Sequence, residues 1–298
     1  MRWFWQRRAP SAPNTPSTPA SGRRFFLGGR RYVADAPYIL PKDLGEINRL
    51  DFQHYMLHSY LRANFLAPVT QPNDILDVGS GTGRWAIQLA QQFPRANVVS
   101  LDIEAPTERQ SALIETQPEN CVFIVGNVLK GLPFPNASFD FVHQRLLMGA
   151  IPGQAWPGVA SELARVTRPG GWVELVEAAP VPSDTPALGQ LHAWMRGATQ
   201  MRGLDITISG RIGDLLRQAG LQQVTYQELP IPIGQHGGRL GLMAETQYDA
   251  LFQTFRPPLV ARGITDDVTF DRVMREAHHE IATHRFISPY FIAYGQRV

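Results

Sequence analysis

Cysteine is nearly absent from this sequence of 298 residues, in which Cys121 is the single example. One cysteine excludes an internal disulfide framework and a metal site built from cysteines. Cys121 precedes an apolar run, so we expect a buried small hydrophobic side chain there and not a nucleophile. His54 and His58 lack a neighbouring set of carboxylates, so we expect no metal site.

Long apolar runs are absent as well. No stretch reaches the roughly 18 apolar residues that a transmembrane helix needs, so we expect no membrane partner. The formal net charge is only +2. Nothing in the sequence indicates a basic face in the folded part of the chain, so we expect no nucleic-acid partner. The composition predicts a soluble, cytoplasmic protein.

Acidic residues are missing from the N-terminal region, where seven arginines precede the first acidic residue, Asp35. Four prolines between residues 10 and 19 disfavour both helix and strand. We therefore expect residues 1–30 to form a disordered tail rich in arginine and proline. Residues 23–27 look like a twin-arginine export signal, but residues 28–31 interrupt its apolar segment, and the prolines disfavour the amphipathic helix of an organelle transit peptide.

Glycine, by contrast, is concentrated in the stretch around which the chain is organised. The apolar residues 75–78 include one acid, Asp77, and Gly79, Gly81 and Gly83 follow at every second position. Apolar residues then recur with helical spacing until Pro94. The pattern predicts a buried parallel strand, a tight turn and a helix whose N-terminus receives a polar or anionic ligand.

The spacing of these glycines argues against a dinucleotide. The dinucleotide fingerprint is Gly-x-Gly-x-x-Gly, whereas this loop is Gly-x-Gly-x-Gly, which disfavours a nicotinamide-dependent oxidoreductase. Asp77 would also repel a pyrophosphate, but it can accept a hydrogen bond from a cationic amino group or hold the N–H groups of the loop. A glycine turn of some other α/β domain is the alternative. The loop resembles the first motif of the class I S-adenosylmethionine-dependent methyltransferases, which implies cofactor contacts from Asp77, Gly79, Ser80, Gly81, Thr82 and Gly83.

The strands predicted after the loop carry polar residues at their ends. The second strand, residues 97–103, ends with Asp102 and Ile103, and Asp102 can accept hydrogen bonds from both hydroxyl groups of a ribose. The third strand, residues 122–128, ends with Asn127 and Val128, which can contact the edge and the face of an adenine ring. We expect all four residues to bind the cofactor.

Two further strands, at 138–145 and 172–177, complete a pattern that resembles the class I methyltransferases over residues 71–180. A narrower match is carried by residues 38–41, 49–54 and 139–145, which look like the UMTA and LaeA-like methyltransferases. That family is tied to secondary metabolism, as tailoring enzymes or as regulators. The resemblance implies a protein that uses S-adenosylmethionine.

Upstream of the first strand, Asp43 predicts a helix N-cap, and Glu46 would complete a capping box. Ile47, Leu50, His54, Leu57 and Leu61 form one stripe of this helix, in which His54 is expected to be a core residue with a satisfied hydrogen bond. We expect residues 31–70 to form a cap over the carboxyl edge of the sheet. Tyr38 and Gln53 of this cap are expected to reach the cofactor.

The C-terminal part predicts two more strands, at 223–229 and 290–295, which in this family form an antiparallel edge pair. The expected fold is α/β, with a Rossmann-like, seven-stranded, mostly parallel sheet in a domain spanning residues 71–298. Insertions at about 181–205 and 234–286 are expected to enclose the acceptor. Four residues of the first insertion suit an apolar pocket, namely His192, Trp194, Met195 and Met201. Their helical spacing is equally typical of ordinary packing.

The predicted function is methyl transfer from S-adenosylmethionine to a small-molecule acceptor, a secondary metabolite. The alternative is a regulatory protein or protein methyltransferase that acts through a protein partner. Transfer of the methyl group mainly requires alignment and the exclusion of water. If the acceptor is a hydroxyl or ammonium group, His143 at the end of the fourth strand is the candidate base, and its alternative role is to hold the loop or contact the cofactor.

Overall fold

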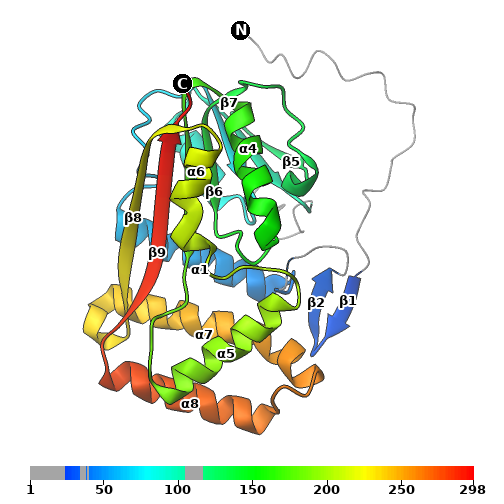
Figure 1. The fold of residues 1–298 in the computed structure, drawn as a ribbon, viewed down its shortest axis with the longest axis vertical. Helices are drawn as coiled ribbons and strands as arrows, with labels where there is room; N and C mark the ends of the chain where they lie inside the picture. Colours follow the sequence, from blue (N-terminus) through cyan, green and yellow to red (C-terminus); the bar gives the residue numbers. More distant parts are fainter. Residues whose placement is uncertain (1–23, 34–37, 39, 105–116) are drawn as a thin grey trace.

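A seven-stranded sheet forms the centre of the protein (Figure 1). The structure, a computed structural model, describes residues 24–33, 38, 40–104 and 117–298. The strands lie in the order β5-β4-β3-β6-β7-β9-β8. Their bounds are β3 Asp74–Val78, β4 Asn97–Asp102, β5 Cys121–Val125, β6 Phe139–Arg145, β7 Thr167–Ala178, β8 Gln222–Ile233 and β9 Phe286–Gln296.

The sheet is parallel from β5 to β7, and β9 then pairs antiparallel with both β7 and β8. The predicted Rossmann-like sheet with its antiparallel edge pair is therefore confirmed. The strand order reverses at β3, because β4 and β5 lie on one side of it and β6 lies on the other. Ligands of open α/β sheets bind at the carboxyl ends of the strands beside such a reversal, so the order itself points to the end of β3.

Both faces of the parallel strands are covered, which explains why these strands are apolar at almost every position. On one face, Leu76 and Val78 pack with α4 (Trp156–Val166) and α6 (Ile212–Gln218). On the other face, Ile75 packs with α2 (Arg84–Gln92). Cys121 lies in this second cluster, where burial raises the pKa of its thiol to about 12, as expected for an inert packing residue.

A layer of helices lies at one end of the sheet, below it in Figure 1. It contains α1 (Leu44–Leu61), α5 (Pro186–Gln200), α7 (Gly238–Ala261) and α8 (Asp267–Thr283). One apolar cluster joins these helices to the adjoining halves of β8 and β9. Among the described residues, no helix is both long and apolar enough to cross a membrane.

The helix α1 begins as predicted, because the Asp43 carboxylate accepts a hydrogen bond from the N–H of Glu46 at 3.0 Å. The predicted capping box is incomplete, however. The Glu46 carboxylate accepts hydrogen bonds from Arg49 and from the Tyr38 hydroxyl instead of turning back to the N–H of Asp43. Arg30 binds the Asp43 carboxylate from outside the helix.

A short hairpin precedes α1, and it corrects the predicted extent of the N-terminal tail. Strands β1 (Arg24–Leu27) and β2 (Arg30–Val33) pair antiparallel, and β1 lies within residues 1–30, which we expected to be disordered. Gly28 and Gly29 supply the two positive φ angles, 55° and 73°, that a two-residue hairpin turn requires. Tyr32 is 4% exposed and its hydroxyl donates to Thr254 O of α7, so tertiary packing holds the hairpin. Residues 1–23 lie outside the described residues.

Candidate active site

The glycine loop is fixed by its backbone conformation. Gly79, Gly81 and Gly83 have φ angles of 71°, 56° and 75°, a region that other L-residues adopt only with strain. The N–H groups of Gly79 and Ser80 donate to Leu101 O at 2.8 and 3.0 Å, which ties the loop to β4. Gly83 caps α2 at its N-terminus and donates its N–H to Ser80 O. The loop therefore presents its remaining backbone to the carboxyl edge of the sheet.

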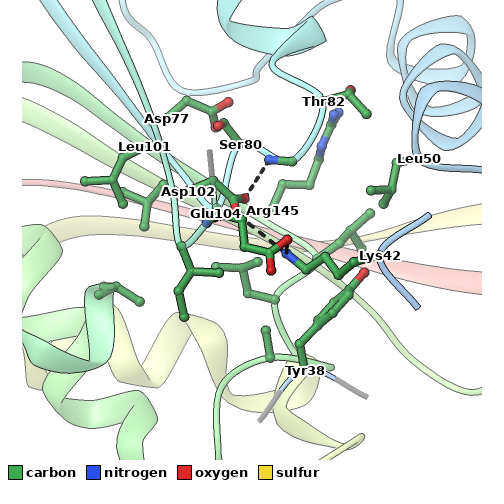
Figure 2. Close-up of a pocket in the computed structure, with 18 of the residues that line it drawn as sticks. Tyr38, Lys42, Leu50, Asp77, Ser80, Thr82, Leu101, Asp102, Glu104 and Arg145 are labelled. Atoms are coloured by element: carbon green, nitrogen blue, oxygen red, sulfur yellow. Dashed lines mark hydrogen bonds and ion pairs between the residues drawn. The ribbon is translucent and has the colours of Figure 1, made fainter. Parts of the chain in front are cut away.

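Asp102, at the end of β4, faces the loop across this edge. Its Oδ2 accepts a hydrogen bond from the N–H of Gly81 at 2.9 Å, and its Oδ1 lies 3.7 Å from Lys42 Nζ. Lys42 also lies 3.8 Å from Glu104 Oε2. Figure 2 shows Asp77, Ser80 and Thr82 on one side of the cavity and Tyr38 with Lys42 on the opposite side. Lys42 and Glu104 were missed from the sequence, because nothing in their local pattern marks them as facing this edge.

The cavity bounded by these groups has a volume of about 170 Å³. It is lined by the loop, the ends of β3 and β4, the segment after β5, and α1. Gly83 lies outside this lining and closes the loop behind it. All the other predicted cofactor residues line the cavity, namely Tyr38, Gln53, Asp77, Gly79, Ser80, Gly81, Thr82, Asp102, Ile103, Asn127 and Val128.

Arg145, at the end of β6, is a lining residue that the sequence analysis did not assign. Its guanidinium donates to Nδ1 of His54 at 3.0 Å, and burial lowers the pKa of His54 to about 3, so this imidazole is neutral and accepts. Within the described residues, no carboxylate forms an ion pair with Arg145, and burial lowers its pKa as well. A partly buried guanidinium without an ion-pair partner is costly, so the cavity is suited to an anionic group of its ligand.

His143, the predicted base, lies behind the loop and lines neither this cavity nor the one that adjoins it, which argues against its role as the base. It is 1% exposed, its ring stacks on Trp85 with centroids 3.9 Å apart, and its Nδ1 lies 3.1 Å from Asp77 Oδ1. A carboxylate only accepts hydrogen bonds, so His143 donates from Nδ1. Burial lowers its pKa in spite of this hydrogen bond. An enclosed imidazole cannot reach an acceptor, and its position fits the alternative role of holding Asp77.

Two buried acids of β7 hold backbone segments in place, and the segment held by Glu177 contributes to the walls of the site. The Glu174 carboxylate accepts hydrogen bonds from the N–H groups of Leu66 and Ala67 at 2.8 and 2.7 Å. The Glu177 carboxylate accepts hydrogen bonds from the N–H groups of Leu147 and Met148 at 2.8 and 3.1 Å. Burial raises the pKa of Glu174 to about 7 and that of Glu177 to about 8. Two acids within an otherwise apolar strand are the sequence signal by which these residues could have been found.

A second cavity, with a volume of about 120 Å³, adjoins the first. The two cavities share four lining residues, Tyr38, Leu50, Gln53 and Leu146. Leu146 has a φ angle of 59°, a left-handed conformation that costs a leucine about 1–3 kcal/mol and is typical of functional sites. Otherwise the second cavity is lined mainly by α1, α5, α7 and residues 178–181.

The residues suggested for an apolar pocket divide between two faces of α5 and its end. His192 and Met195 line the second cavity. Trp194 faces away from it, because its ring stacks on Phe270 of α8 with centroids 5.7 Å apart. Met201, just beyond the helix, is 56% exposed. Positions 192 and 195 lie on one face of the helix, which lines the cavity. Position 194 lies on another face, which packs against α8.

The chain resembles known methyltransferases. A family model described as a methyltransferase domain matches residues 75–171. The N-methyltransferase sirN of Leptosphaeria maculans is 30% identical over 225 residues, which cover 72% of this chain and 77% of that protein. The secondary metabolism regulator laeA of Aspergillus flavus is 30% identical over 245 residues, which cover 77% of this chain and 64% of that protein.

Solved structures share the fold at low sequence identity. Haemonchus contortus phosphoethanolamine N-methyltransferase 2 superposes with a TM-score of 0.52 and 15% identity, covering 84% of this chain and 52% of that one. The strand order, the acidic residue before the glycine loop and the similarity to sirN agree with one another. The chain therefore belongs to the class I S-adenosylmethionine-dependent methyltransferases, in the group that includes the LaeA-like proteins.

Proposed function

We propose that the first cavity binds S-adenosylmethionine through residues of β3, β4 and β6. The Asp102 carboxylate accepts hydrogen bonds from the ribose hydroxyl groups, while Asn127 and Val128 contact the adenine ring. The amino-acid part of the cofactor carries both charges, and the cavity offers a group for each of them. Asp77 holds the ammonium group and Arg145 holds the carboxylate, which supplies the anion that this guanidinium lacks within the described chain.

The acceptor occupies the second cavity. The observation that carries this proposal is that the two cavities share the walls formed by Tyr38, Leu50, Gln53 and Leu146. A molecule in the second cavity would therefore lie next to the cofactor. The helices of the insertions at 181–205 and 234–286 enclose this space, and the cap at 31–70 lies against both cavities.

Alignment is the main contribution of the protein to the reaction. When bound, S-adenosylmethionine supplies a methyl group on a positively charged sulfur. Among the described residues, the four that line both cavities include neither a carboxylate nor a histidine. Holding the two reactants in line in a space without water can supply about 7–11 kcal/mol of the barrier reduction. We therefore assign the residues of the shared wall to positioning and the exclusion of water.

The acceptor is a small molecule, a secondary metabolite, in this proposal. A mostly apolar cavity suits a small molecule of this kind better than it suits a protein side chain. The named activity of sirN, an N-methyltransferase, supports an enzyme. The similarity to the regulator laeA favours the second candidate, a protein that binds S-adenosylmethionine and acts through a protein partner.

The two candidates are separated by the fate of a labelled methyl group. The purified chain is incubated with methyl-labelled S-adenosylmethionine and a whole lysate of the host cells, which contains both metabolites and proteins, and the products are divided into organic-soluble and protein fractions. Label in an organic-soluble product supports the small-molecule enzyme, and label confined to protein favours the second candidate. Calorimetry that detected no binding of S-adenosylmethionine would overturn both.

A matched variant tests the acceptor cavity separately. Ala244 lines the second cavity only and is 4% exposed, so Ala244→Phe fills that space without touching the first. We expect labelled product to be lost while the affinity for S-adenosylmethionine is retained. Retained cofactor affinity also shows that the variant is folded. Full product formation by this folded variant would place the acceptor elsewhere.

A further inference from the structure

Two polar side chains form a pair in the second cavity and do not belong to the lining shared with the first. Tyr248 of α7 and His192 of α5 are 8% and 6% exposed, and the Tyr248 hydroxyl lies 2.8 Å from His192 Nε2. Both line the second cavity and neither lines the first. They therefore face a molecule in the second cavity and not the cofactor.

Three other polar side chains of this cavity, Thr199, Arg49 and Gln247, are engaged within the protein. The Thr199 hydroxyl donates to Met195 O of its own helix at 2.9 Å. Arg49 is paired with Glu46 at 2.6 Å, and the Gln247 amide, oriented by its surroundings, bonds to Arg49 and Gln53. By contrast, the hydrogen bond between Tyr248 and His192 leaves capacity on the phenol oxygen, which can take part in more than one hydrogen bond.

The free capacity of the pair suits a hydroxyl group. If Tyr248 donates to His192, its oxygen accepts from a ligand. If His192 donates to Tyr248, the phenol O–H donates to a ligand. A hydroxyl group both donates and accepts, so it satisfies the pair in either arrangement.

A charged group does not suit this end of the cavity. Burial lowers the pKa of His192 to about 4, so its ring is neutral near pH 7. The surrounding walls include Met195, Leu251 and Phe252, and the charge of Arg49 is already paired. Burying an unpaired charge in such surroundings costs far more than burying a hydroxyl group that has a partner.

We propose that the pair of His192 and Tyr248 recognises a hydroxyl group on an uncharged, largely apolar acceptor. This inference rests on the proposed function of the second cavity. A dry cavity of about 150 Å³ in another protein binds benzene, so a space of about 120 Å³ is close to the size of one ring. A phenol is the simplest ligand of this class.

Binding of a matched pair of probes tests the proposal. The full chain is saturated with S-adenosylhomocysteine, which occupies the first cavity, and is titrated with 4-fluorophenol or fluorobenzene under ¹⁹F NMR observation. Both probes are expected to bind. The measured quantity is the ratio of their two dissociation constants, because the probes differ only in the hydroxyl group.

The ratio is compared between the parent chain and a double variant, His192→Leu with Tyr248→Phe. A hydroxyl group buried without a partner costs about 1–3 kcal/mol, so the double variant should shift the ratio towards fluorobenzene by about 5- to 150-fold. Thr199→Val is the control, because Thr199 lines the same cavity but its hydroxyl is bonded to its own helix. The control should leave the ratio unchanged.

A second measurement needs no variant. In the parent chain labelled with ¹⁵N-histidine, one neutral imidazole should shift when 4-fluorophenol is added and should stay in place when fluorobenzene is added. Equal shifts with both probes would overturn the proposal, as would failure of both probes to bind or an equal ratio in the double variant and the control. In each of these cases S-adenosylhomocysteine still binds, and only the present inference fails. Failure of the parent chain to bind S-adenosylhomocysteine would overturn the proposed function together with it.

Discussion

Nδ1 of His143 donates a hydrogen bond to Oδ1 of Asp77 over 3.1 Å, and the two residues are register partners on the neighbouring strands β6 and β3. The imidazole thus fixes the carboxylate that faces the cofactor cavity while remaining 1% exposed itself. We propose that it orients Asp77 and does not accept a proton in the reaction.

His143→Phe separates these two roles. The phenyl ring keeps the stacking on Trp85 but leaves Asp77 without its donor. We expect the affinity for S-adenosylmethionine to fall by about tenfold, since a hydrogen bond to a charged group contributes about 1.5–3 kcal/mol. At saturating cofactor the rate should stay within a few fold of the parent. A loss of about 10²–10⁴ in that rate, with one limb of the pH profile removed, would restore His143 as a base.

Arg145→Met should change stability and affinity in opposite directions. Without cofactor, the melting temperature should be unchanged or higher, because the guanidinium lacks an ion-pair partner in the described chain. The affinity for S-adenosylmethionine should fall by about ten- to a hundredfold. Arg84→Met is the control, because Arg84 is paired with Asp51 at 3.3 Å. A large drop in the cofactor-free melting temperature of Arg145→Met would show that this residue holds the fold and not the ligand.

Asp102→Ala should weaken the binding of S-adenosylmethionine by about ten- to a hundredfold, because it removes a charge-assisted hydrogen bond to the ribose. It also removes the acceptor of the Gly81 N–H. Asp102→Asn keeps an acceptor for this N–H, so it should bind more tightly than the alanine variant but less tightly than the parent. Asp214→Asn is the control, because Asp214 is an exposed acid that is paired with Arg217 and lines neither cavity. Normal affinity of the alanine variant in calorimetry would remove Asp102 from the site.

We expect the contribution of the buried acid Glu177 to the stability of the fold to be lost at high pH. Its pKa is raised from 4.5 to about 8 in the folded chain, mainly by burial. The folded state thus holds a proton that the unfolded state releases, so this contribution is fully present below about pH 4 and is lost as the pH rises through 8. The stability difference between the parent and Glu177→Gln, measured by urea unfolding, should therefore decrease from pH 6 to pH 9. Glu276 forms an exposed ion pair with Arg272, so the stability difference between the parent and Glu276→Gln should not decrease over this pH range.

Leu57→Ala tests whether α1 is part of the folded core. Leu57 is 1% exposed in the apolar cluster that joins the helices to β8 and β9, so its truncation should cost about 2–5 kcal/mol of unfolding free energy. Tyr55, on the same helix, is 43% exposed, and Tyr55→Ala should cost much less. Equal effects of the two substitutions in urea unfolding would make α1 an independent appendage.

The glycine loop and Asp102 could be predicted because the information is local. Three glycines with positive φ angles and an acid at the next strand end constrain the backbone within a short stretch. The buried position of His143 was not predicted, although it follows from the way successive side chains of β6 alternate between the two faces of the sheet. His143 shares a face with Phe141, which packs against α2, and that parity directs the imidazole away from the cavity.

The second cavity could not be predicted in the same way, because its walls come from segments far apart in the chain. His192 and Tyr248 lie 56 positions apart and meet only when α5 packs beside α7. The hairpin β1–β2 was missed for a similar reason. Its strands are short, and its position depends on the contact of Tyr32 with Thr254, 222 positions away.

The separation of the two cavities has a consequence for redesign. The cofactor cavity draws on residues up to Ile151, whereas most of the acceptor cavity comes from residues after Ala178, and the walls in common are four residues. Exchanging the inward-facing residues of α5 and α7 between relatives should therefore transfer acceptor preference as a unit, with the cofactor apparatus left as it is. A single scaffold of this kind can serve as a common host for many acceptor chemistries.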